Sequence, residues 1–162
     1  MKMKKVKNSA PNVLFLDETK VHPALKEFFG YCLTKSALRY KALHNEALKK
    51  LNIQSHHLGI LKVVESGPIS QIDLGAELGV DKASMVKCID HLEKIGLVER
   101  RGDLEDRRIK NVGLTAKGAQ LLKNAKKIRQ QVEDNFLKPL NAEQQKIFRK
   151  LVSLLLPDKR DL

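Results

Sequence analysis

The chain is poor in cysteine and in aromatic residues, and it has no tryptophan. Its two cysteines, Cys32 and Cys88, are too few for a disulfide scaffold and do not form a pair with zinc-binding spacing. Because aromatic residues make up only 4% of the sequence, a stacking surface for single strands or unpaired RNA bases is disfavoured. These shortages exclude a disulfide-stabilised secreted domain.

Long apolar runs and catalytic motifs are also missing. No run approaches the roughly 18–20 residues of a membrane span. The Lys-rich residues 1–7 are followed by a short apolar stretch, residues 13–16, whereas a signal-peptide core needs about 7–15 residues. We find no Gly-rich phosphate loop, nucleophile elbow or His-Glu-x-x-His pattern. We therefore expect a cytoplasmic protein that is not an enzyme, with no catalytic residues, cofactor or bound metal.

What the chain has in excess is positive charge. It carries 31 Lys and Arg against 19 Asp and Glu, a net charge of +12 over 162 residues. Residues 100–129 hold ten basic and three acidic side chains, whereas residues 63–81 hold four acidic and no Lys or Arg side chains. A basic surface zoned in this way indicates an acidic partner, of which nucleic acid is the commonest.

The two ends of the chain are predicted to be helical. After a loose basic arm (residues 1–20), apolar residues recur at three- and four-residue steps and predict one helix over about 22–51. Thr115 caps a long helix that fades near Pro139, and Asn141 caps a final one. These apolar faces are too wide to bury within one chain of this size, so we expect a homodimer with intertwined terminal helices.

The central part of the sequence predicts short helices and a hairpin. Helices begin at Gln54–Ser55 and at Ser70, and a third runs from Asp81 to about Ile95. Two short strands around a charged loop follow and predict a β-hairpin. The fold class is therefore mainly α with a small β-wing. We divide the chain into the arm (1–20), a dimerisation helix (21–54), a winged helix-turn-helix DNA-binding region (55–114) and C-terminal dimerisation helices (115–162).

The turn before Asp81 carries the helix-turn-helix pattern. Small residues at Gly75 and Ala76 let two helices approach, Gly79 allows a positive φ, and Val80 fills the space between the helices. A helical hairpin without a DNA role would also satisfy this spacing.

If the helix after Asp81 (about 81–95) enters a major groove, its exposed polar residues reach DNA. Lys82 and Lys87 suit phosphates or guanine acceptors, and Ser84 suits a base or phosphate. We interpret Asp90 and Lys94 as a solvated helix face. The full set of expected DNA-binding residues is Ser70, Gln71, Lys82, Ser84, Val86, Lys87, His91, Arg100, Arg107, Arg108 and Lys110.

The wing (residues 102–109) is both basic and acidic. Its arginines suit the enhanced negative potential of an adjacent minor groove. Its acidic residues do not serve DNA affinity, so we expect Asp106 to form a salt bridge that holds an arginine in a fixed orientation.

Three segments together resemble the signature of the MarR family. They are Gly96-Leu97-Val98-Glu99-Arg100, Asp103-Leu104-Glu105-Asp106-Arg107-Arg108 and Leu114-Thr115-Ala116-Lys117-Gly118. The resemblance covers about residues 22–156. It implies a dimeric winged-helix repressor or activator that binds a pseudo-palindrome with two recognition helices and two wings. It also implies that a small anionic or phenolic ligand, or an oxidant, acts near the junction of the dimerisation and DNA-binding parts.

The sequence departs from that family at several positions. Val86 stands where Ser or Thr is frequent, and Lys87 stands where Arg is frequent, so the base preference of relatives does not transfer. The second helix begins Gln54-Ser55-His56-His57 in place of the usual Thr-x-x-Gln, and the N-terminal arm is longer than is typical.

The residues that would sense a signal are less clearly marked. We name Cys32, His44 and His57 as a candidate ligand pocket among the first, second and fifth helices, suited to an aromatic acid. For Cys32 and Cys88, a buried inert thiol is the favoured interpretation. Since the adjacent His56 and His57 are expected to point in different directions, at most one of them can join His44, which disfavours a zinc sensor.

Two classes of function remain open after this reasoning. The first is a MarR-type transcriptional regulator that binds double-stranded DNA as a homodimer. The second is a winged-helix protein-interaction module without sequence-specific DNA binding. The retained cations at Lys82, Lys87, Arg107 and Arg108 favour the regulator.

Overall fold

The computed structural model describes residues 21–102 and 110–156. The chain divides into two units, residues 1–42 and 43–162, and their boundary lies within helix α1 (Phe29–Leu48). In the described part of the chain, no helix is long and apolar enough to cross a bilayer.

The first helix is shorter than the sequence predicts. The predicted continuous helix over 22–51 is wrong at both ends, because the 3₁₀ turns η1 (Pro23–Leu25) and η2 (Lys49–Leu51) flank α1. Asn52 ends the segment in the left-handed region, at φ +54°. Asparagine tolerates this conformation, and the chain leaves the helical path there.

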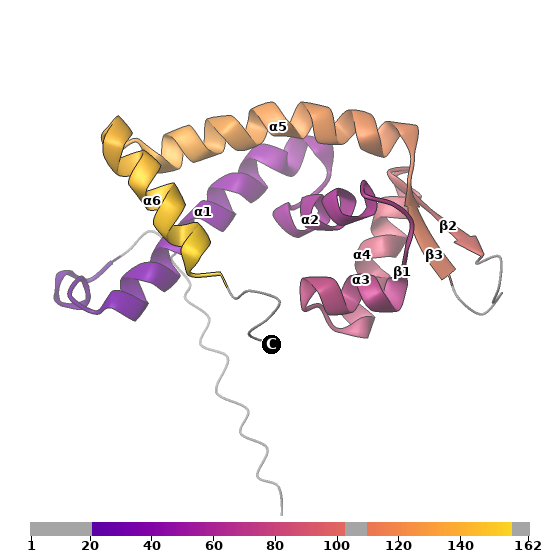
Figure 1. The fold of residues 1–162 in the computed structure, drawn as a ribbon, viewed down its shortest axis with the longest axis horizontal. Coiled ribbons are helices and arrows are strands. Elements are labelled where there is room, and N and C mark those ends of the chain that lie inside the picture. The colour runs from indigo at the N-terminus through magenta and orange to yellow at the C-terminus, as the bar shows by residue number, and fades with distance from the viewer. Residues whose placement is uncertain (1–20, 103–109, 157–162) are drawn as a thin grey trace, which may run out of the picture. The chain divides into compact units, whose positions relative to one another are not determined.

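The second unit contains the remaining helices and a small sheet (Figure 1). Their bounds are α2 (Ser55–Val64), β1 (Ile69–Ser70), α3 (Gln71–Leu78), α4 (Lys82–Lys94), β2 (Val98–Gly102), β3 (Lys110–Leu114), α5 (Ala116–Leu137) and α6 (Ala142–Leu154). Ser70, Asp81, Thr115 and Asn141 each accept a hydrogen bond from the backbone N–H three residues later, which confirms them as helix caps.

The sheet has three antiparallel strands in the order β1-β3-β2. The predicted hairpin is confirmed, with Val98 opposite Leu114 and Gly102 opposite Lys110. The third strand, β1, pairs Ile69 with Val112. The sequence predicts a helix that begins at Ser70 but no strand there, because a strand of two residues is too short to show an alternating pattern.

The core of the second unit lies between α2, α3, α4 and the sheet. Met85, Ile89 and Leu92 are fully buried and form the inward stripe of α4 at three- and four-residue spacing. Leu61 of α2 and Val112 of β3 belong to the same cluster. The α5 helix packs on α2 and leads to α6, which an ion pair between Arg149 and Glu133 (2.6 Å) joins to α5 (Figure 1).

A close backbone contact connects the start of α5 to the loop before the wing. Thr115 Oγ1 accepts the Gly118 N–H (3.0 Å) and lies within hydrogen-bond distance of the Gly96 (2.8 Å) and Leu97 (3.1 Å) carbonyls. A Cβ on Gly118 would lie 2.2 Å from the Leu97 carbonyl oxygen and 2.7 Å from Leu114 Cδ1. Gly118 is therefore required by packing.

The variant Gly118→Ala should be destabilised by about 1–3 kcal/mol, because backbone must move to admit the methyl group. Gly59→Ala is the matched control: Gly59 also lies within a helix, but its Cβ would meet nothing within 4 Å. That control should gain about 0.5–1 kcal/mol from helix propensity. Urea unfolding measures both changes, and equal stability of the two variants would contradict the close-contact interpretation.

Candidate nucleic-acid interface

The α4 helix is held at its N-terminus by the turn that precedes it. Gly79 has φ +61°, as predicted, and a Cβ on the buried Gly75 would lie 3.0 Å from the Val80 carbonyl oxygen. Asp81 accepts the Ser84 N–H at 3.0 Å, and its hydrogen bonds with Ser84 lower the pKa of its carboxyl group. The helix-turn-helix therefore has the two glycines where backbone conformation and close approach require them.

The outer surface of α4 is cationic at its N-terminal half. Lys82, Ser84 and Lys87 are exposed, and Val86 is half-buried beside them. They lie outside the buried stripe of α4, near the positive end of the helix dipole. This surface offers two point charges, a hydroxyl group and a methyl-bearing side chain to an anionic partner.

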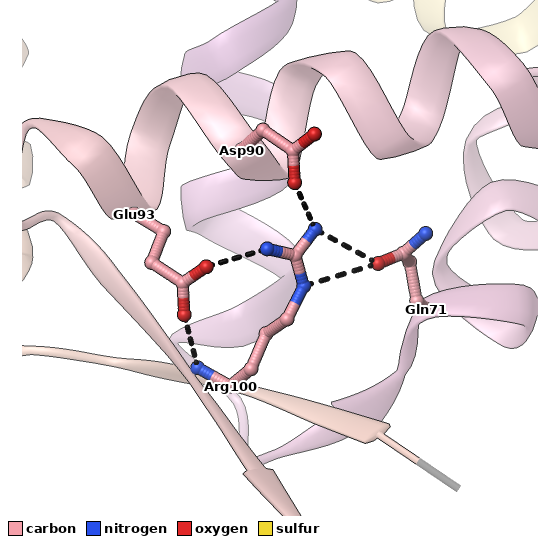
Figure 2. A network of polar contacts seen from close by, with 4 residues as sticks. All are labelled: Gln71, Asp90, Glu93 and Arg100. Atoms are coloured by element: carbon pink, nitrogen blue, oxygen red, sulfur yellow. Dashed lines mark hydrogen bonds and ion pairs between the residues drawn. The ribbon is translucent and has the colours of Figure 1, made fainter.

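A network centred on Arg100 joins α3, α4 and β2 (Figure 2). The guanidinium group binds Asp90 Oδ1 (2.6 Å) and Glu93 Oε2 (2.5 Å), and it donates to Gln71 Oε1 at 3.3 and 3.4 Å. Burial by itself would lower the pKa of Arg100, but the hydrogen bonds of the two carboxylates raise it overall. Arg100 is therefore charged and paired, with a side chain that is 22% exposed.

Two residues named in the sequence analysis have local partners in this region. Asp90, which was interpreted as part of a solvated face, is indeed exposed (58%), and its carboxylate is also an ion-pair partner of Arg100. Ser70 also has a local role: it caps α3, and its hydroxyl donates to Asp73 at 2.6 Å. The sequence spacing of ten residues between Asp90 and Arg100 carries no periodic signal that would have revealed the pair.

Three histidines lie close together where the first turn of α2 meets the last turn of α4. His91 Nε2 lies 2.8 Å from the Asn52 carbonyl oxygen, and its ring stacks on His57 with centroids 5.0 Å apart. The His56 ring is 4.1 Å from that of His57, so the expectation that these two point apart is wrong. They occupy the first turn of α2, and the ligand atoms of His56, His57 and Cys88 lie within 4.8 Å of one another.

Burial sets the protonation of this group. Burial is the main reason why the pKa of His57 is lowered to about 4, and the charges of His56 and His91 lower it further. His57 Nδ1 accepts the Gln54 N–H at 3.1 Å, which caps α2. Burial raises the pKa of the Cys88 thiol, and the negative charge of Asp81 raises it further. His57 is therefore neutral near pH 7.

The wing is described only at its base. Arg101 and Lys110 are exposed on β2 and β3, and Arg101 forms an ion pair with Glu99. Asp106, Arg107 and Arg108 lie outside the described residues.

A pocket of about 560 Å³ lies between the C-terminal end of α1, α2 and α5. His44 lines it, together with Lys62, Lys123, Lys126 and Arg129. Burial and then Arg129 lower the pKa of His44, while Glu133 acts in the opposite direction.

The three residues named for a ligand pocket do not meet in this cavity. His57 faces the other histidines, and Cys32 lies in the first unit, where its thiol is 3.1 Å from the Lys26 carbonyl oxygen. Cys32 is half-buried, and Cys88 is too.

Replacing Arg100 should destabilise the fold. Arg100→Lys should cost about 2 kcal/mol, because a single ammonium group does not bind three separated acceptors as a guanidinium does. Arg101→Lys is the matched control, since Arg101 is 65% exposed and has one exposed partner, and it should change stability by less than about 0.5 kcal/mol. Equal denaturant midpoints for the two variants would contradict a structural role for Arg100.

The comparisons with known proteins agree with this geometry. Residues 54–110 match the sequence model of the MarR family. A probable transcriptional regulator from Pseudomonas aeruginosa is 26% identical, with a TM-score of 0.73 over 82% of this chain and 99% of that one. Reduced MarR from E. coli is 25% identical, with a TM-score of 0.73 over 85% and 99% of the two chains.

A third solved structure has a DNA partner. It is a cysteine-to-serine mutant of E. coli MarR complexed with operator DNA, 25% identical, with a TM-score of 0.69 over 79% of this chain and 93% of that one. The fold is thus shared well beyond the segment that matches the family sequence. Together with that match over residues 54–110, this shows that the chain is similar to MarR-family proteins in its central sequence and in its fold.

Proposed function

We propose that this protein is a cytoplasmic transcriptional regulator that binds double-stranded DNA as a homodimer. The observation that carries the proposal is the cationic outer surface of α4, with Lys82, Ser84 and Lys87 exposed on a helix fixed from behind by Arg100. The operator complex of the E. coli MarR mutant, which shares the fold, supports a duplex as the partner. In this proposal α4 enters the major groove.

The residues of α4 divide into two roles. Lys82 and Lys87 contact phosphates or guanine acceptors, and Ser84 contacts a base or a phosphate. Val86 packs on a thymine methyl group, which its half-buried position on the outer surface allows. His91 is directed to the Asn52 carbonyl, so it contributes by fixing the helix.

Arg100 and Gln71 act together. The two carboxylates occupy the guanidinium, so Arg100 serves DNA binding by positioning α4 against β2. Gln71 Oε1 faces Arg100, which leaves its amide group as the donor for a phosphate or a base.

The wing supplies the second contact. Arg107, Arg108 and Lys110 reach the adjacent minor groove or its phosphates, and Asp106 orients one of the arginines. The described part of the wing supports this, because β2 starts in the Arg100 network and Lys110 is exposed where β3 begins.

A dimer is supported by apolar surface that each unit leaves exposed. On α6, Ile147 is 49% exposed, Leu151 53% and Leu154 69%. The first unit exposes Phe28 and Phe29. Contiguous apolar area of this kind is typical of a protein–protein interface. We propose that both units contribute to a two-fold interface with a second copy of the chain.

Regulation by a small anionic ligand is supported by the pocket beside α5. Lys123, Lys126 and Arg129 bring positive charge to its wall, and Lys62 is paired with Glu65 at 2.5 Å. A carboxylate with an apolar body would find cations on α5 and apolar contacts at Leu58 and Leu122.

The central test is selection of bound duplexes from a random pool, followed by salt titration. We expect an inverted-repeat site, and a plot of log affinity against log salt with a slope of about −0.9 for each phosphate contacted. Lys87→Ala should weaken binding and reduce the slope by about 1 for each copy bound. Lys138→Ala, which removes a lysine at the C-cap of α5, should leave both values unchanged.

Two outcomes would contradict this proposal. One is the absence of any preferred sequence, which would favour a protein-interaction module. The other is equal salt slopes for Lys87→Ala and wild-type protein, which would remove α4 from the interface.

Disruption of the α6 surface should prevent dimerisation. Leu151→Glu places a charge on an exposed apolar position, so it should yield monomers in sedimentation velocity while the helical circular dichroism persists. Lys150→Glu is the neighbouring control and should remain dimeric. A dimeric Leu151→Glu protein would show that α6 lies outside the interface.

A further inference from the structure

We propose that His56, His57 and Cys88 form a Zn²⁺ site between the N-terminus of α2 and the recognition helix α4. Their ligand atoms all lie within 4.8 Å of one another. The metal site itself is independent of the DNA-binding proposal, and only its effect on DNA affinity rests on that proposal.

The donor types suit zinc. A thiolate and two neutral imidazoles are borderline-to-soft ligands, which favour zinc over magnesium or calcium. Three protein ligands leave a fourth tetrahedral position for water, and exposed His56 provides access for the ion. The ordinary preferences of the three side chains therefore converge on one class of metal.

Metal binding requires the three ligand atoms to move slightly closer together. With metal–ligand bonds of about 2.0–2.3 Å, the ligand atoms of a tetrahedral site lie roughly 3.3–3.7 Å apart. The cluster must therefore contract by about 1 Å, a movement within the range of side-chain rotation. His56 is exposed and Cys88 is half-buried, so neither is locked by surrounding core.

Metal binding at His57 is incompatible with its present hydrogen bond. His57 Nδ1 accepts the Gln54 N–H, so this nitrogen has no proton in the structure. If Nδ1 binds the metal, the bond to Gln54 is displaced. If Nε2 binds the metal, the proton moves to Nδ1, which then no longer accepts. In either case metal binding releases the cap at the start of α2.

The site also acts on the recognition helix. Cys88 directly follows Lys87 and lies four residues after Ser84, so it shares the backbone that carries the proposed DNA contacts. A metal that pulls Cys88 toward α2 shifts this segment relative to the Arg100 network. We therefore expect zinc to change the affinity for DNA.

The first experiment is a zinc titration of the chelator-treated full-length protein against a competing indicator dye. His56→Gln and Cys88→Ser should each lower zinc affinity roughly tenfold or more. Co²⁺, a weaker-binding substitute, should give a thiolate charge-transfer band that Zn²⁺ abolishes and that Cys88→Ser lacks. Cys32→Ser and His22→Gln, the matched controls, should bind zinc as the wild type does.

The outcomes of this experiment test the zinc site itself, separately from its effect on DNA affinity. Wild-type zinc affinity in both His56→Gln and Cys88→Ser would overturn the site, as would loss of the cobalt band in Cys32→Ser. Circular dichroism of Cys88→Ser confirms that it is folded before the comparison is made.

The second experiment measures affinity for the selected duplex with and without zinc. We expect roughly a fivefold or larger change in wild type and none in Cys88→Ser. Zinc binding through Cys88 with unchanged DNA affinity would overturn the coupling between the two sites. A protein that binds zinc but no duplex in either state would instead overturn the proposed function.

Discussion

Arg100 lies where α3, α4 and the first strand of the wing meet, and its guanidinium binds an acceptor from two of these elements while its own backbone belongs to the third. The side chain is mostly buried, so removal of one partner leaves charge without a full set of hydrogen bonds. The planar fork of the guanidinium fixes directions as well as distances. The orientation of α4 relative to β2 therefore depends on this residue.

A second connection passes from the wing to the long α5 helix. The backbone contact at Gly118 and the hydrogen bonds of Thr115 place the start of α5 directly against Leu97, which precedes β2. Farther along, α5 forms one wall of the cationic pocket and carries α6 through the Arg149–Glu133 ion pair. One continuous helix thus connects the wing, the pocket and the apolar surface of α6.

The parts of this structure that were predictable from the sequence depend on local pattern. Caps at Asp81 and Thr115, the glycine turn and the buried stripe of α4 arise from interactions within a few residues, so the sequence shows them. The Arg100 network and the His56–His57–Cys88 cluster were missed because they join side chains brought together by tertiary packing. The strand β1 was missed because two residues carry no period.

The register of the hairpin has a consequence for the Arg100 network. Gly102 is paired with Lys110, and the other four pairs of the hairpin lie on the base side of that pair. Arg100, opposite Val112, is the middle pair of this register. A slip of β2 by one residue against β3 would turn Arg100 to the other face of the sheet, away from Asp90, Glu93 and Gln71. The pairing of the hairpin and the Arg100 network are therefore fixed together, and neither can shift without breaking the other.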